Sequence, residues 1–148
     1  MTEGVKALAA ELLETQAKRQ NMGGFSFGAD STWQKEFAES FIYQETPDQL
    51  SVIEQITGDM IEAVPMDRLL CGDVGYGKTE LAMRAAFKAV EAGKQVAVLV
   101  PTTVLCVQHG RTFAQRFADF PITIETLNRF NSAKNAKDII TWVTSPLG

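Results

Sequence analysis

The chain contains, at residues 72–79, the run Gly72-Asp73-Val74-Gly75-Tyr76-Gly77-Lys78-Thr79. This run fits the pattern G-x-x-x-x-G-K-[ST], in which glycines let backbone N–H groups turn inward around a phosphate without a side chain in the way. It lies between a short apolar run and an alanine-rich stretch that predicts a helix. A helix that begins at such a loop offers N–H groups and a partial positive charge to an anion. The run therefore predicts a phosphate-binding loop.

Two side chains at the end of the run have defined roles in such a loop. Lys78 is expected to reach the β and γ phosphates of ATP, and Thr79 to place its hydroxyl on the Mg²⁺ that neutralises them. A dinucleotide fingerprint is rejected, because Glu80 stands where a third glycine or alanine is needed. The predicted cofactors are therefore ATP and Mg²⁺.

Apolar and amphipathic segments alternate after the loop motif. The stretch 95–100 is apolar on both faces, which favours a central parallel strand, and the stretch 122–127 alternates as a half-buried strand does. The predicted order is strand 69–71, helix 79–91, strand 95–100, helix 103–117, strand 122–127 and helix 133–140. This order predicts an α/β fold with an open parallel sheet of the RecA-like P-loop type, as an incomplete lobe.

The residues before the loop predict helices and a packed connector. Apolar residues recur at helical spacing over residues 5–13, so the sheet is expected to follow an N-terminal amphipathic helix. Residues 25–40 mix aromatic residues with glycine and aspartate, which suggests a packed connector and a short helix. Thr46 and Pro47 then predict the start of a helix that ends before Pro65.

Composition limits the possible partners and compartments. The formal net charge is -4 and the pI is near 5.0, so any contact with nucleic acid has to be local. No segment reads as a targeting signal or a membrane span, and a cytoplasmic protein with no membrane partner is expected. The two cysteines, Cys71 and Cys106, lie in apolar runs and are expected to be buried, reduced thiols.

Four stretches carry a resemblance that extends over about residues 5–137. They are Tyr43 to Leu50, Pro65 to Glu80, Met83 to Ala89 and Val98 to Leu105. They are similar to the first motor lobe of the bacterial transcription-repair coupling factor family, which are superfamily 2 translocases on double-stranded DNA. RecG, a related helicase, shares the loop but not the residues that follow it. The resemblance implies an ATP-driven motor whose parent protein displaces stalled RNA polymerase and recruits excision-repair proteins.

The resemblance also implies a division of the chain. Residues 1–40 are expected to form a connector helix and aromatic segment, and residues 41–148 the N-terminal part of the ATP-binding motor lobe, truncated before the Walker B motif. No apolar strand after Thr79 ends in the acidic pair that ATP hydrolysis needs, so the chain is expected to be inactive alone. The resemblance fails at residues 140–148.

The family implies a base-binding role for residues upstream of the loop. Gln49 resembles the glutamine that reads the adenine edge, with Phe41 or Tyr43 as the base-stacking neighbour. The residues themselves allow a second role, because Thr46-x-x-Gln49 is also a capping box in which Gln49 bonds back to the N-cap. Both interpretations remain open at this point.

DNA contacts are implied on two segments after the loop. Thr102 and Thr103 resemble a motif whose hydroxyls and N–H groups hold a phosphate of the DNA backbone, although Thr103 is equally explained as a helix cap. Arg129 and Lys134 belong to a second backbone-contacting segment. Asn131 replaces the expected arginine there, which weakens the predicted contact.

Three functions remain open from the sequence. The first is an ATP-binding fragment of a DNA translocase. The second is a small P-loop phosphotransferase, which would need an acceptor pocket and lid arginines. The third is an interaction module or decoy that acts through its first helix.

Overall fold

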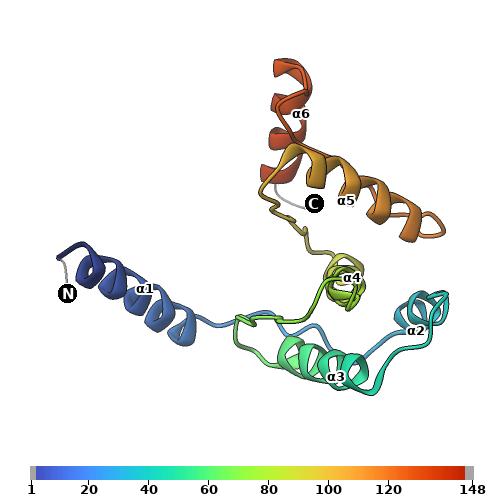
Figure 1. The fold of residues 1–148 in the computed structure, drawn as a ribbon, viewed down its shortest axis with the longest axis horizontal. Coiled ribbons are helices and arrows are strands. Elements are labelled where there is room, and N and C mark those ends of the chain that lie inside the picture. Colours follow the sequence, from blue (N-terminus) through green and yellow to red (C-terminus); the bar gives the residue numbers. More distant parts are fainter. Residues whose placement is uncertain (1–2, 146–148) are drawn as a thin grey trace. The chain divides into compact units, whose positions relative to one another are not determined.

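The computed structural model describes residues 3–145, and every regular element over that range is a helix (Figure 1). Most of these helices begin where the sequence predicts a start. The helices are α1 (Glu3–Asn21), α2 (Thr32–Glu39), α3 (Pro47–Ile61), α4 (Lys78–Glu91), α5 (Thr103–Arg116) and α6 (Ala133–Thr144). Residues 146–148, the end of the segment at which the resemblance fails, lie outside the described range.

Side-chain caps explain why several helices begin at these residues. Hydroxyl oxygens of Ser31, Thr46, Thr102 and Ser132 each accept a hydrogen bond from the backbone N–H three residues further on. Such a bond satisfies one of the N–H groups that a helix leaves unpaired at its first turn. The starts are therefore encoded within a few residues of sequence.

The predicted parallel sheet is wrong, because residues 3–145 contain no strand. The stretches 69–71, 95–100 and 122–127 connect helices without ladder hydrogen bonds. Leu99 is 98% exposed and Leu69 is 87% exposed, where central strands would be buried on both faces. A strand needs neighbours that pair its N–H and C=O groups. The apolar pattern shows which side chains are apolar, but it does not show whether neighbouring strands are present to pair with the segment.

The chain divides into two compact units, Met1–Lys88 and Ala89–Gly148, and the division falls within α4. In the first unit the rings of Phe37 and Phe87 stack with centroids 4.4 Å apart, and both side chains are only 1% exposed. Met60 and Leu81 are buried as well. The first unit therefore has an aromatic core shared by α2, α3 and α4.

The connector before α2 is tied to the end of α3 by backbone bonds. The N–H of Gly24 donates to the carbonyl of Ala63 at 2.7 Å, and the N–H of Phe27 donates to the carbonyl of Met60 at 3.0 Å. These bonds tie the segment to the end of α3, although Phe25 is 49% exposed. The helix α1 itself is present as predicted, but its apolar side chains are exposed, including Leu12 at 62% and Leu13 at 70%.

The second unit has a smaller core. The rings of Phe113 and Phe117 stack with centroids 5.7 Å apart, and Ile139 of α6 is buried in the same unit. Cys106 is half-buried and Cys71 is exposed, so the expectation that both thiols are buried is wrong. Within residues 3–145, each helix is too short or too polar to cross a bilayer.

Candidate functional site

The run from Gly72 to Thr79 forms a tight loop that leads directly into α4. Gly75 and Gly77 have φ angles of +84° and +86°, a region that L side chains rarely adopt. The N–H of Tyr76 donates to the carbonyl of Asp73 at 3.2 Å, which closes the turn. Val74 lies at the tip and is fully exposed. The two glycines are thus required by the backbone of this loop.

The ammonium group of Lys78 is folded back over the loop. Its Nζ donates to the carbonyl of Gly72 at 2.5 Å and to the carbonyl of Asp73 at 2.6 Å. Lys78 is also the first residue of α4, and Thr79 is the second. The structure therefore brings the predicted phosphate-binding lysine, the predicted Mg²⁺-binding threonine and the N-terminus of a helix to one place.

Gln49 connects this loop to α3. Its Oε1 accepts from the N–H of Thr46 at 2.9 Å, and its own N–H donates to the Thr46 hydroxyl at 3.3 Å, which confirms the capping box. Its Nε2 donates to the carbonyl of Tyr76 at 2.5 Å. A Cβ on Gly77 would come within 2.7 Å of the same Nε2. Gln49 thus contacts the loop directly, and adenine recognition stays a prediction.

The two predicted stacking residues lie against each other. The rings of Phe41 and Tyr43 meet edge to face with centroids 5.5 Å apart. Tyr43 is 69% exposed, whereas Phe41 is half-buried and has the guanidinium of Arg84 5.6 Å from its ring centroid. A cation at this distance from an aromatic face is attracted by the ring quadrupole. The aromatic segment is thereby connected to α4.

Arg84 forms the centre of a network of charged and polar groups. It donates from Nε to Glu80 at 3.1 Å, it forms an ion pair with Glu45, and its side chain is only 14% exposed. The hydrogen bond from Arg84 lowers the pKa of the Glu45 carboxyl below its ordinary value. Glu80 is buried as well. Arg84 and Glu80 are therefore paired where little water reaches them, whereas Glu45 stays partly exposed.

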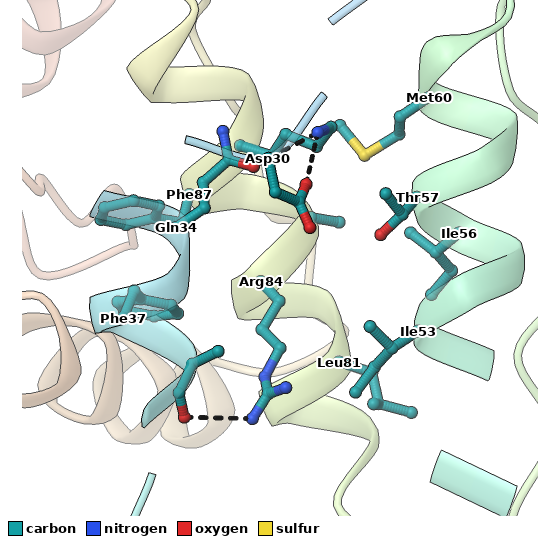
Figure 2. A pocket seen from close by; sticks show the side chains of 13 residues that line it. Asp30, Gln34, Phe37, Ile53, Ile56, Thr57, Met60, Leu81, Arg84 and Phe87 are labelled. Carbon is teal, nitrogen blue, oxygen red and sulfur yellow. Dashed lines mark hydrogen bonds and ion pairs between the residues drawn. The ribbon is translucent and has the colours of Figure 1, made fainter. Parts of the chain in front are cut away.

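A second ion pair lies further along α4. Lys88, which is 3% exposed, donates from Nζ to Asp30 at 2.7 Å and to Gln34 at 3.2 Å. Figure 2 shows Gln34 and Phe37 on one side of the surrounding pocket and the α3 side chains on the other, with Arg84 between them. The sequence analysis did not single out Arg84 or Lys88. The available signal was a four-residue spacing, because Arg84 lies four residues after Glu80 and Lys88 lies four residues after Arg84.

The predicted DNA-contacting threonines lie at the start of α5 in the second unit. The hydroxyl of Thr102 accepts from the N–H of Leu105 at 3.2 Å, so the cap is Thr102. The alternative that Thr103 caps this helix is therefore wrong, and Thr103 is the first residue of α5. The two residues are adjacent at one helix N-terminus, and their DNA contact stays a prediction.

The other two predicted DNA-contacting residues flank a turn before α6. The guanidinium of Arg129 lies 4.9 Å from the ring centroid of Phe130, and Lys134 is exposed on the first turn of α6. Asn131 stabilises this turn, because its Oδ1 accepts from Asn128 at 2.7 Å and its Nδ2 donates to Thr126 at 3.1 Å. Its amide thus has a structural role here.

Acidic metal sites are not evident in the described part of the chain. Over residues 3–145, no group of three His, Cys, Asp or Glu side chains is arranged to hold a metal ion. The Mg²⁺ contact of Thr79 stays a prediction.

Known proteins resemble most of this chain. The family model for DEAD/DEAH box helicases matches residues 46–145. The transcription-repair-coupling factors of Mycobacterium bovis and of Bacillus subtilis are each 53% identical over 136 residues, which is 92% of this chain. These matches cover 11% and 12% of the respective relatives, so the chain spans about one-ninth of their length.

A solved structure agrees with this similarity. The structure of RecG bound to a three-way DNA junction matches with a TM-score of 0.81 and 32% identity, covering 90% of this chain and 18% of RecG. The chain thus resembles the helicase-like region of the transcription-repair-coupling factor, which confirms the resemblance found in the sequence.

Proposed function

Since the chain belongs to the DEAD/DEAH box helicase family, we propose that it is the ATP-binding segment of a DNA translocase. The observation that carries this proposal is the loop at residues 72–79, with two left-handed glycines and the Lys78 ammonium folded over it. An anion bound in the loop could replace the two carbonyl oxygens as the partner of that ammonium. Residues 41–88 would provide the nucleotide contacts, and the segment before them would connect to the rest of the protein.

The hydrogen-bond donors of the loop are suited to binding the phosphates of ATP. Backbone N–H groups between Gly72 and Thr79, the Lys78 ammonium and the N-terminus of α4 all favour negative charge. Thr79 would place its hydroxyl on Mg²⁺ bound to the phosphates. When bound, ATP and Mg²⁺ supply the phosphoryl group and the charge that neutralises it, and this chain's residues hold and orient them.

We place the adenine base next to Gln49, Phe41 and Tyr43. Gln49 already contacts the carbonyl of Tyr76 in the loop, so a base read by this amide would lie beside the phosphates. Reading adenine would require the amide to exchange one of its present partners, Thr46 or Tyr76. The exposed ring of Tyr43 offers a stacking surface.

The second unit would contact the backbone of double-stranded DNA. Thr102 and Thr103 place N–H groups at the start of α5, and Arg129 and Lys134 place positive charge around the start of α6. Contacts of this kind position a protein on the duplex without reading its sequence. We expect RNA polymerase and excision-repair proteins as partners, which agrees with the words transcription and repair in the relatives' name. We also expect the cytoplasm as the compartment.

Replacing Lys78 tests the proposal directly. Lys78→Ala removes the ammonium and should weaken the binding of Mg²⁺-ATP at least tenfold, or about 1.4 kcal/mol. Isothermal titration calorimetry of the two proteins gives both dissociation constants. Equal affinities for wild type and variant would rule out the loop as the phosphate site.

A further inference from the structure

Arg84 contacts several groups that come from one upstream segment. Its guanidinium pairs with Glu45, lies 5.6 Å from the ring centroid of Phe41, and donates to the carbonyl of Ala38 at 3.5 Å. Glu80, one turn earlier on α4, accepts from its Nε at 3.1 Å. One side chain thus joins the aromatic segment, residues 38–45, to the helix that begins at the phosphate loop.

These contacts form a continuous series that starts at Glu45, passes through α3, the phosphate loop and α4, and returns to Glu45 through Arg84. Glu45 directly precedes Thr46, which caps α3 through Gln49. Gln49 in turn bonds the Tyr76 carbonyl in the loop, and the loop continues into α4 and back to Arg84. The aromatic segment is therefore connected to the loop by two routes, one through Thr46 and Gln49 and the other through Arg84 and α4.

We propose that Arg84 is a positioning residue for the base side of the nucleotide site, because it fixes the segment that carries Phe41 and Tyr43 relative to the phosphate loop. This inference rests on the proposed function. A flexible aromatic segment would lose conformational entropy when a base binds, and a segment that is already held loses less. Binding of phosphate at the loop does not involve the aromatic segment, so its affinity does not depend on how firmly that segment is held.

The difference between base and phosphate binding provides the test. The variant Arg84→Met keeps an unbranched side chain but removes the charge and the donors. Calorimetry should give ATP binding weakened about fivefold or more, while inorganic tripolyphosphate with Mg²⁺ stays within about twofold of wild type. A purely structural role would weaken both ligands equally, and that outcome would overturn the proposal.

A matched control separates this role from the general loss of an ion pair. Arg68 forms an ion pair with Asp59 at 2.6 Å in the same unit and bonds Gln55. Arg68→Met removes the same chemical groups without touching the aromatic segment. We expect it to bind ATP as wild type does. A loss in Arg68→Met equal to that in Arg84→Met would contradict a specific role for Arg84.

A second variant keeps the proposal testable if Arg84→Met does not fold. Glu45→Gln preserves the shape of the partner and removes its charge, and it should also weaken ATP but not tripolyphosphate. Where both variants fold, the double variant should bind ATP no more weakly than Arg84→Met alone, since the two residues act as one unit. Unchanged ATP affinity in either single variant would overturn the inference.

Failure of the proposed function gives a different result. In that case the wild-type protein would bind neither ATP nor tripolyphosphate, and both the proposed function and this inference would be refuted. If wild type binds the two ligands with equal affinity, the phosphate loop stands and the role of Arg84 in base binding is refuted.

Discussion

The phosphate loop at residues 72–79 and the apolar stretch at residues 95–100 gave equally clear sequence signals, and their structures differ. The loop holds its conformation with its own glycines, with Lys78 and with Gln49. The apolar stretch has no ladder partner among the described residues, and Leu99 is 98% exposed. A motif that contains its own bonding partners can be read locally, whereas a strand depends on chain that has to lie beside it.

The largest expected effect comes from the aromatic core behind the loop. Phe87 is 1% exposed and stacks on Phe37, so Phe87→Ala should destabilise the chain by about 3–5 kcal/mol through lost burial and a residual cavity. Denaturant unfolding measures this change. A loss of unfolding free energy below about 1 kcal/mol would mean that Phe87 is packed no better than the side chains of residues 95–100. The two regions would then not differ in packing.

A methyl group added at Gly77 should disturb the contact between the loop and Gln49. Gly77→Ala places a Cβ in a left-handed conformation and within 2.7 Å of the Gln49 Nε2, so we expect a loss of about 2–3 kcal/mol. Gly75→Ala is the matched control, because its φ is +84° but nothing lies near its Cβ. Unfolding free energies that are equal for the two variants would show that the Gln49 contact contributes nothing.

The ion pair of Glu45 with Arg84 makes stability depend on pH. Its hydrogen bond with Arg84 lowers the pKa of Glu45 below the ordinary value of 4.5. A depressed carboxyl pKa gives stability that is fully present above pH 4.5 and is lost as the pH falls through the folded-state value. Because solvent screens this partly exposed pair, Glu45→Gln should cost less than about 1 kcal/mol at neutral pH.

The pH profile of that variant provides the check. The difference in unfolding free energy between wild type and Glu45→Gln should shrink as the pH falls below 4.5. A difference that stays constant down to pH 3 would show that the carboxylate charge is not what stabilises this segment.

The smallest expected effect belongs to the apolar stretch. Leu99→Ala should change the unfolding free energy by less than about 0.5 kcal/mol, because the side chain is almost fully exposed. Denaturant unfolding again gives the value. A loss of about 2 kcal/mol or more would reveal burial of Leu99 and would restore the similarity between the two regions.

These differences explain how far the sequence alone could go. Helix starts and the loop were predictable, since Thr46, Ser132 and Lys78 bond groups within six residues of themselves. The pair of Arg84 with Glu45 joins positions 39 residues apart, and no short spacing reveals it. The sheet was predicted wrongly because apolar alternation is a property of one segment, whereas a sheet is a property of several.

The ion pair between Asp30 and Lys88 also bears on the order in which the first unit folds. It joins positions 58 residues apart. Closing such a loop costs chain entropy, and this cost arises before the contact can stabilise the fold. The caps of α2 and α3 need bonds across only three residues and can form early. We expect the Asp30 contact to form last during folding, so that the connector is the latest part of this unit to become ordered.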